Sequence, residues 1–181
     1  MRRRARWRDR RSASSSDFSI SNDGSARRIA PKALDKFKTQ VRDKTRRTRG
    51  ISLPQLIEDL TPYLIGWRGY FGFCQTPSVL RALDEWTRRR LRAIAWKQWK
   101  RGRTRFAELR RCGVGRDLAA QTAGSPHGPW RLANSPALTI AMPNRFFASL
   151  GLASVGAPPP HNPPNRRIRT RTSGGVGGEE P

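Results

Sequence analysis

The chain has 181 residues, and its 37 Lys and Arg side chains against 13 Asp and Glu produce a formal net charge of +24. A chain of this length is too short for a multidomain enzyme, and its apolar runs fall short of the roughly 18 residues that span a bilayer. The basic N-terminus continues into serines instead of an apolar signal sequence, and the two cysteines form no disulfide framework. We therefore expect a soluble, cytoplasmic protein whose charge is offset by a bound polyanion.

The type of basic residue narrows the choice of polyanion. Most of the basic side chains are Arg, whose planar guanidinium matches phosphate oxygens in pairs and stacks on bases. Six Trp residues are present, several of them among the arginines. Arginines interleaved with aromatic side chains favour nucleic acid over a membrane surface, where a charged face would oppose a clean apolar face.

Composition divides the chain into segments. Residues 1–17 form a basic, serine-rich arm, and residues 153–181 form a tail rich in Pro, Gly and Arg. We expect both to be disordered because neither has a hydrophobic period. Between them, apolar residues recur at helical spacing, and no stretch alternates with period two for long enough to form a sheet. The predicted fold is all-α, with a compact basic helical bundle at 31–112 and a small C-terminal helical unit at 113–152.

Proline, glycine and capping residues predict where the first helices begin and end. A helix over residues 31–49 starts with Pro in its first position and ends before Gly50. Ser52 and Gln55 form a capping box for a second helix, in which each residue satisfies a backbone amide of the other. We expect Pro62 to break or kink that helix, because proline removes a hydrogen-bond donor and clashes with the preceding turn.

An aromatic segment at 62–73 leads into the longest predicted helix, over residues 76–101. Thr87 lies in the inner stripe of that helix, where its hydroxyl needs a partner such as the carbonyl of Leu83. A shorter helix over 104–111 has Thr104 as its cap. Further short helices are predicted over 116–123, 135–142 and 144–150.

Side chains that support catalysis are scarce. Polymerases and metal-dependent nucleases hold divalent metal with clustered carboxylates. Here Glu58 and Asp59, like Asp84 and Glu85, are sequence neighbours that a helix points about 100° apart. We interpret them as solvated charges that pair with nearby arginines. The cysteines and histidines lack zinc-site spacing, so we expect no catalytic residue, no metal site and no cofactor.

The long helix carries the strongest binding signal. Its second half combines apolar residues with cations spread over several turns, and each cation that neutralises a phosphate releases a counterion. The alternative is that these cations only keep the helix surface solvated. A solvated surface usually mixes charges of both signs, whereas this one has only Glu85 upstream. The candidate phosphate-binding residues are Arg88, Arg89, Arg92, Lys97, Lys100 and Arg103.

Three motifs resemble a known family. They are Tyr63-Leu-Ile-Gly-Trp-Arg-Gly-Tyr-Phe-Gly-Phe-Cys, Leu83-Asp-Glu-Trp-Thr-Arg-Arg-Arg-Leu-Arg and Trp96-Lys-Gln-Trp-Lys. In order and spacing they resemble the maturase-specific domain (domain X) of bacterial group II intron reverse transcriptase/maturases. The resemblance extends over residues 18–152.

This resemblance implies a helical thumb that grips intron RNA and helps the ribozyme to reach its splicing-active fold. A protein that prefers the active conformer shifts the RNA population toward it. By similarity, Tyr63, Trp67 and Trp86 hold the bundle together. Also by similarity, the RNA-facing cations are Arg46, Arg47, Arg49, Arg68, Arg88, Arg89, Arg92, Lys97 and Lys100.

The flanking segments resemble neighbouring parts of such proteins. Residues 18–30 look like a remnant of the connection to a reverse-transcriptase domain, and residues 113–152 look like the small DNA-binding region. The candidate DNA contacts there are Trp130, Arg131 and Asn134. The partners that the resemblance implies are group II intron RNA, target DNA and a separate reverse-transcriptase chain.

The sequence also departs from the family. The fingers and palm, with their metal-binding Tyr-Ala-Asp-Asp motif, are missing, and no His-Asn-His endonuclease motif follows. We therefore expect no polymerase activity. Two alternatives stay open: a vestigial fragment of a truncated intron reading frame with only general nucleic-acid affinity, and a ribosomal-type structural protein that binds rRNA.

Overall fold

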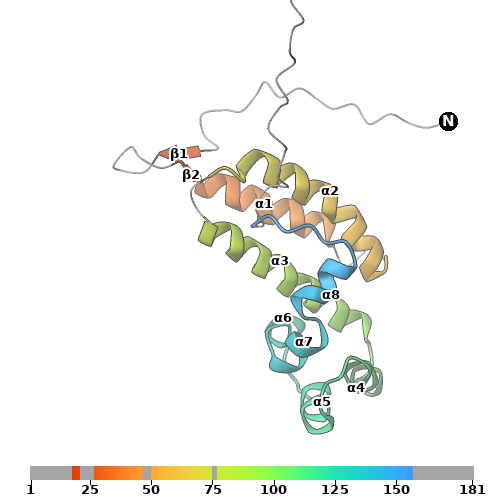
Figure 1. Ribbon diagram of the computed structural model, residues 1–181. Helices are drawn as coiled ribbons and strands as arrows, with labels where there is room; N and C mark the ends of the chain where they lie inside the picture. Colours follow the sequence, from red (N-terminus) through yellow and green to blue (C-terminus); the bar gives the residue numbers. More distant parts are fainter. Residues whose placement is uncertain (1–17, 21–26, 47–49, 75–76, 157–181) are drawn as a thin grey trace, which may run out of the picture.

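The computed structural model describes residues 18–20, 27–46, 50–74 and 77–156, and these residues are mostly helical (Figure 1). The elements in chain order are β1 (Phe18–Ile20), β2 (Arg27–Ile29), α1 (Pro31–Lys44), α2 (Leu53–Phe71), α3 (Pro77–Gln98), α4 (Gly102–Arg111), α5 (Arg116–Ala123), α6 (Pro129–Leu132), α7 (Pro136–Ala141) and α8 (Asn144–Ser149). The predicted all-α class is confirmed. The predicted arm at 1–17, and the predicted tail from residue 157 onward, lie outside the described residues.

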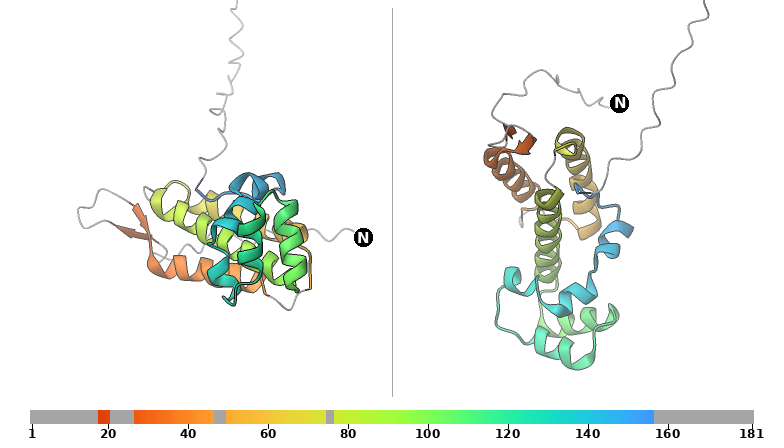
Figure 2. Two further views of the ribbon diagram at one scale, coloured as in Figure 1. Left: turned by 90° about the horizontal axis from the view of Figure 1, so that it is seen from below. Right: turned by 60° about the vertical axis from the view of Figure 1, so that its left-hand side comes forward.

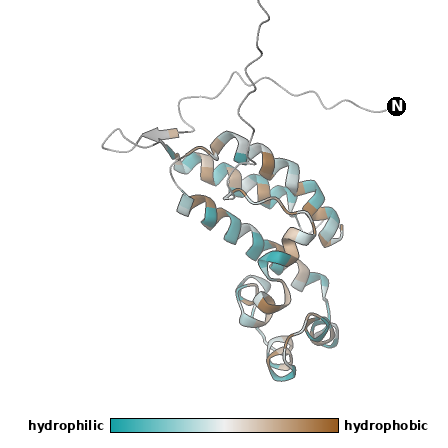
Figure 3. Ribbon diagram, in the orientation of Figure 1, coloured by the Kyte–Doolittle hydropathy of each residue, from teal (hydrophilic) through white to brown (hydrophobic). Residues whose placement is uncertain are grey.

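The three longest helices, α1, α2 and α3, form the main body of the molecule (Figure 1). Apolar residues recur along each of them between polar ones, as the alternating colours of Figure 3 show. Phe37 of α1, Leu60 of α2 and Leu91 of α3 are completely buried where these stripes meet. Burying one such side chain contributes about 1.5–3 kcal/mol relative to leaving it exposed.

Aromatic rings fill the space between α1 and α2. Trp67 lies between Phe37, whose ring centroid is 4.8 Å away, and Phe71, at 4.4 Å. Tyr63 packs one turn earlier on α2, 5.7 Å from Phe37. The predicted packing roles of Trp67 and Tyr63 agree with these contacts, which hold the two helices together.

A short antiparallel hairpin precedes α1 and corrects the expectation that no sheet forms. β1 pairs with β2 in the register Phe18 to Ile29. Each strand has three residues, so the period-two signal that sequence analysis relies on is too short to detect. The ring of Phe18 lies 5.3 Å from those of Tyr70 and Phe71, which anchors the hairpin to the end of α2.

α1 ends earlier than predicted, whereas the predicted capping box at the start of α2 is confirmed. α1 ends at Lys44 and not near residue 49. The buried Thr45 follows it, and its hydroxyl donates to the carbonyl oxygen of Val41. The capping box is present: the backbone N–H of Ser52 donates to Gln55 Oε1 at 3.2 Å.

Pro62 lies in the middle of α2 and does not end it, so the predicted break is absent. α2 runs from Leu53 to Phe71 through Pro62. Pro62 is exposed, so the carbonyl that lost its donor faces water, whereas Leu60 and Leu64 on either side are buried against the bundle. Tertiary packing of these neighbours outweighs the local cost of about 3 kcal/mol.

The long helix α3 and the short helix α4 follow the predicted order. The hydroxyl of Thr87 donates to the carbonyl oxygen of Leu83 at 2.8 Å, as predicted for a buried threonine. α4 begins at Gly102 with Arg101 at its N-cap, so Thr104 is not the cap. Among the described helices, none is both long and apolar enough to cross a membrane.

Helices α4 to α8 form a smaller unit at the C-terminal end of α3 (Figure 1, Figure 2). Leu109, Val114, Leu138 and Phe147 are buried within it and join the core of the main body. α5 has the predicted bounds, and Ser135 caps α7 by accepting from the backbone N–H of Leu138 at 3.4 Å. A helical unit at this end is therefore present, but it includes α4, which the sequence analysis assigned to the main bundle.

The chain after α8 returns to the N-terminal half of α3, which corrects two expectations. Asp84 is buried and not solvated, and its carboxylate accepts from the backbone N–H groups of Val155, at 2.9 Å, and Gly156, at 3.0 Å. Val155 is completely buried. Residues 153–156 are thus part of the folded structure, although their composition resembles the tail.

We expect Trp67→Ala to lower the free energy of unfolding by about 3–5 kcal/mol, because it removes a buried ring between two others. Urea denaturation followed by circular dichroism measures this loss. Ile65→Ala is the matched control, since Ile65 lies on the same helix with 55% of its surface exposed. It should change stability by no more than about 0.5 kcal/mol. Equal losses in the two variants would contradict the packing role of Trp67.

Burial raises the pKa of Tyr63 from 10.0 to about 12. The folded chain therefore keeps this proton at a pH where the unfolded chain releases it. The stabilising contribution of the neutral phenol is complete below about pH 10 and is lost as the pH rises toward 12. Titration of tyrosinate absorbance should show a late component that Tyr63→Phe removes. A normal midpoint for both of the chain's 2 tyrosines would contradict this expectation.

Candidate nucleic-acid interface

A groove of about 1070 Å³ lies between the end of α1, the start of α2, the C-terminal half of α3 and α6. Its lining combines apolar residues at the base with amide, hydroxyl and cationic groups, and contains no Asp or Glu. The four cations of the lining are Arg46, Arg90, Lys97 and Lys100. We call this feature the basic groove. A concave surface with charges of one sign focuses the electrostatic field and attracts anions.

Helical geometry directs part of α3 toward the basic groove. Arg90 and Lys97 are seven residues apart, which is close to two turns, so they lie on one face of the helix. Ala93 lies between them on the same face and, with Ile94, contributes an apolar base. The two cations are thereby spaced along the groove by about 10.5 Å, at 1.5 Å of rise per residue.

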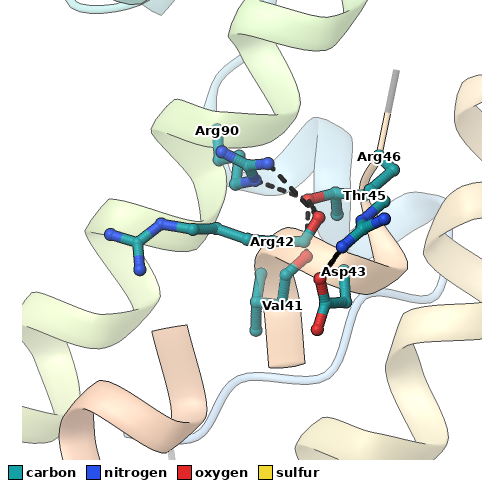
Figure 4. A network of polar contacts seen from close by, with 6 residues as sticks. All are labelled: Val41, Arg42, Asp43, Thr45, Arg46 and Arg90. Carbon is teal, nitrogen blue, oxygen red and sulfur yellow. Dashed lines mark hydrogen bonds and ion pairs between the residues drawn. The ribbon is translucent and has the colours of Figure 1, made fainter. Parts of the chain in front are cut away.

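Arg90 joins α3 to the end of α1 (Figure 4). Its Nε donates to the hydroxyl of Thr45, and its Nη2 donates to the carbonyl oxygen of Arg42 at 3.4 Å. Burial, and to a lesser extent the charge of Arg42, lower the pKa of the Arg90 guanidinium below its ordinary value. Arg90 therefore places the C-terminal end of α1, with Arg46, at the wall of the groove.

A second hydrogen bond joins α3 to the turn between α1 and α2. Gln98 at the end of α3 donates through Nε2 to the carbonyl oxygen of Ile51 at 3.0 Å. Gly50, just before it, has φ +63°, a conformation that favours glycine and lets the chain turn into α2. These residues also line the basic groove, so the turn between α1 and α2 forms part of its surface.

An exposed tryptophan borders the basic groove at α6. Trp130 lines it with 42% of its surface exposed. Arg89 of α3 contacts both the backbone and the ring of Trp130. Its Nε and Nη2 donate to the Trp130 carbonyl oxygen at 3.2 and 3.1 Å. Its guanidinium carbon lies 4.4 Å from the centroid of the Trp130 ring. The indole is therefore fixed in place by a cation stacked on it.

Trp86, three residues before Arg89 on α3, lies close to Trp130. Its ring lies 6.5 Å from that of Trp130. The guanidinium carbon of Arg42 lies 5.5 Å from the Trp86 ring, and that of Arg90 lies 6.0 Å from it. The electron-rich faces of the ring attract both cations, which allows two like charges to stay close to one another.

The structure brings together some of the predicted RNA-binding residues. Arg46, Lys97 and Lys100 line the basic groove, and Arg89 supports its Trp130 border. Arg103 is exposed on α4, whereas Arg68 and Arg88 are half-buried and do not line the groove. Arg47 and Arg49 lie in the segment 47–49, which the structure does not describe.

Arg92 is buried, which does not fit the phosphate-facing position that the sequence predicts for it. It keeps 8% of its surface exposed, donates through Nε to the carbonyl oxygen of Met142 at 3.0 Å and lies 5.6 Å from the ring centroid of Phe147. Burial, followed by the charge of Arg88, lowers its pKa. The residues 88 and 92 share a face of α3 that turns toward α8 and not toward the groove.

Sequence reasoning missed Arg90 as a residue of the interface. The signal was present in the run Arg88-Arg89-Arg90, whose members a helix directs about 100° apart. Only the packing of α1 and α6 on α3 decides which of the three enters the groove. Of the candidate DNA contacts, Trp130 lines the groove, and Arg131 and Asn134 are exposed in and just after α6.

Other reactive groups lie elsewhere. Burial raises the pKa of the Cys112 thiol, which opposes its ionisation to a nucleophilic thiolate. Cys74 is buried in the core. Within the described ranges, no three His, Cys, Asp or Glu side chains are grouped so as to hold a metal ion.

Comparison with known proteins agrees with the resemblance seen in the motifs. A search of curated proteins found no match to the chain. Residues 34–113 match the family model described as "Group II intron, maturase-specific domain". This span runs from α1 to just after α4 and includes all four cations of the basic groove, whereas Trp130 lies beyond it. Over residues 34–113, the chain is therefore similar to the group II intron maturase-specific domain.

Proposed function

We propose that the chain binds group II intron RNA in the basic groove and thereby favours the splicing-active fold of that RNA. A maturase-specific domain suggests a role in group II intron splicing, and the matched segment contains the groove cations. The observation that carries the proposal is the lining itself: Arg46, Arg90, Lys97 and Lys100 face one concavity that has no carboxylate. RNA phosphates would supply the missing negative charge.

Arg46 shows how a phosphate can enter. Its Nη2 lies 3.0 Å from Asp43 Oδ1, and the Arg46 side chain is 70% exposed. An exposed pair of this kind contributes only about 0–1 kcal/mol, because water screens both charges. A phosphate that offers two oxygens to the guanidinium can replace this carboxylate at small cost.

The proposed effect on splicing is a shift between RNA conformers. A protein that binds two conformers equally well changes nothing, whereas each tenfold preference for one of them shifts the equilibrium by about 1.4 kcal/mol. The groove would discriminate through spacing. Two of its cations lie on α3, one lies just after α3 and one just after α1, so only an RNA fold that presents phosphates at matching positions meets them all. Splicing chemistry would stay with the RNA, and the chain would act in the cytoplasm by binding alone.

We further propose that α6 extends the contact surface for nucleic acid. Trp130 borders the groove, and Arg131 and Asn134 are exposed beside it. The continuity of this region with the basic groove supports a shared surface for intron RNA and for the target DNA that the resemblance implies. A separate reverse-transcriptase chain would be the partner that uses such a complex.

Lys97→Glu combined with Lys100→Glu should weaken binding to intron RNA and lower the slope of log K against log salt by about two, because each lysine neutralises about one phosphate. Filter binding across a salt series measures both quantities. The control is Arg116→Glu with Arg145→Glu, which changes the net charge equally at two exposed positions away from the groove. Similar slopes in the two double variants would place RNA binding outside the groove.

The unmodified chain should bind a group II intron RNA more tightly than a scrambled RNA of equal length and composition. General polyanion affinity would predict equal affinities, because phosphate contacts alone carry no sequence information. Competition filter binding with the two RNAs distinguishes these outcomes. Equal affinity at every salt concentration would favour the fragment with general nucleic-acid affinity over the maturase function.

A further inference from the structure

We infer that Trp130 is a stacking platform for one unpaired nucleobase, whose neighbouring phosphates bind the lysines of the basic groove. This inference rests on the proposed function, since it assigns a chemical class of ligand to a part of the same groove. It goes beyond that function because phosphate binding by itself requires no base contact. The ligand would be a single-stranded or extruded nucleotide and not a continuous duplex.

The exposure of Trp130 is the first observation. The ring of Trp96, on the neighbouring helix α3, keeps 1% of its surface exposed, whereas Trp130 keeps 42%. Trp130 also lies beyond the segment that forms the main helical bundle and lines the groove at its border. Leaving such an indole in water forgoes much of the stabilisation that burial would supply.

The support behind the ring is the second observation. Arg89 donates two hydrogen bonds to the Trp130 carbonyl oxygen and places its guanidinium 4.4 Å from the ring centroid. Trp86 approaches from the same part of α3 at 6.5 Å. A ring that is already held loses little conformational entropy when a ligand stacks on it, which favours binding. Arg89 is in this sense a positioning residue for Trp130.

The charge around the ring identifies the class of ligand. An apolar peptide would cover the indole but leave Lys97 and Lys100 without a counter-charge at the same groove. A duplex would supply phosphates, but its bases are stacked on one another and offer no free face. An unpaired nucleotide supplies both a flat aromatic face and flanking phosphates, and aromatic rings next to Arg or Lys are the groups that bind such nucleotides.

The size of the groove agrees with this ligand. Its volume of about 1070 Å³ is slightly above the range of clefts that hold small molecules, about 300–1,000 Å³. The groove is therefore large enough for one base with its sugar and adjoining phosphates.

The test compares two short RNA strands of equal charge on the full chain: an oligouridylate and an abasic strand of the same length. Both supply the same phosphates, but only the first supplies bases. The unmodified chain should bind the oligouridylate more tightly. Trp130→Ala should reduce this preference by about 5- to 160-fold and leave affinity for the abasic strand unchanged. Trp130→Phe should restore part of the preference.

Control variants separate this site from the groove as a whole. Ile140→Ala removes an apolar side chain that is 51% exposed on α7 and should change neither affinity. Lys97→Glu with Lys100→Glu should weaken both strands alike. If abasic affinity does not fall in that double variant, the proposed function fails and the inference fails with it. If Trp130→Ala keeps the full base preference, the stacking site alone is overturned.

A crosslinking arm requires no variant and so does not depend on whether Trp130→Ala folds. Strands that carry 5-iodouridine form photochemical bonds to aromatic side chains stacked on the base. Crosslinks mapped to Trp130 support the inference, and crosslinks only at other residues overturn it. The deoxyribose version of each strand shows whether RNA or single-stranded DNA is the preferred source of the nucleotide.

Discussion

The basic groove depends on the contact between Arg90 and the end of α1. Arg90 donates to the hydroxyl of Thr45 and to the carbonyl oxygen of Arg42, and these bonds hold α1 where its last turn forms a wall beside α3. The arrangement gathers cations whose mutual repulsion opposes the fold. Trp86, whose ring lies close to both Arg42 and Arg90, offsets part of that repulsion by attracting the two cations. A polyanion in the groove would relieve the remainder, so folding and ligand binding support each other.

Two different faces of α3 carry two kinds of charged residue. On the groove side, Arg90 and Lys97 face a space open to a ligand. On the other side, Arg92 donates to the carbonyl oxygen of Met142, and Asp84 accepts from the backbone amides of Val155 and Gly156. Buried charges of this second kind are satisfied within the chain, and they fasten the C-terminal elements to the helix.

Local features of the structure were predictable wherever neighbouring residues decide them. The box formed by Ser52 and Gln55, the internal hydrogen bond of Thr87 and the cap at Ser135 each involve partners three or four residues away. The same local reasoning failed at Pro62, because burial of the helix on either side outweighs the free-energy cost of a proline inside it. The packing of residues 153–156 on α3 was also missed, because Asp84, which accepts from the backbone N–H of Val155, is 71 residues away from it.

The sequence by itself determined the helical class, the excess of cations and the family motifs, since periodicity, composition and order are properties of the chain alone. Only the tertiary structure decided which cations face a common space. Arg88, Arg89 and Arg90 are equivalent in the sequence, yet the packing of α1 and α6 on α3 directs one of them into the groove and another beneath an exposed indole. The physical reason is that a side chain's exposure depends on which elements cover its face of the helix, and those elements are distant in the chain.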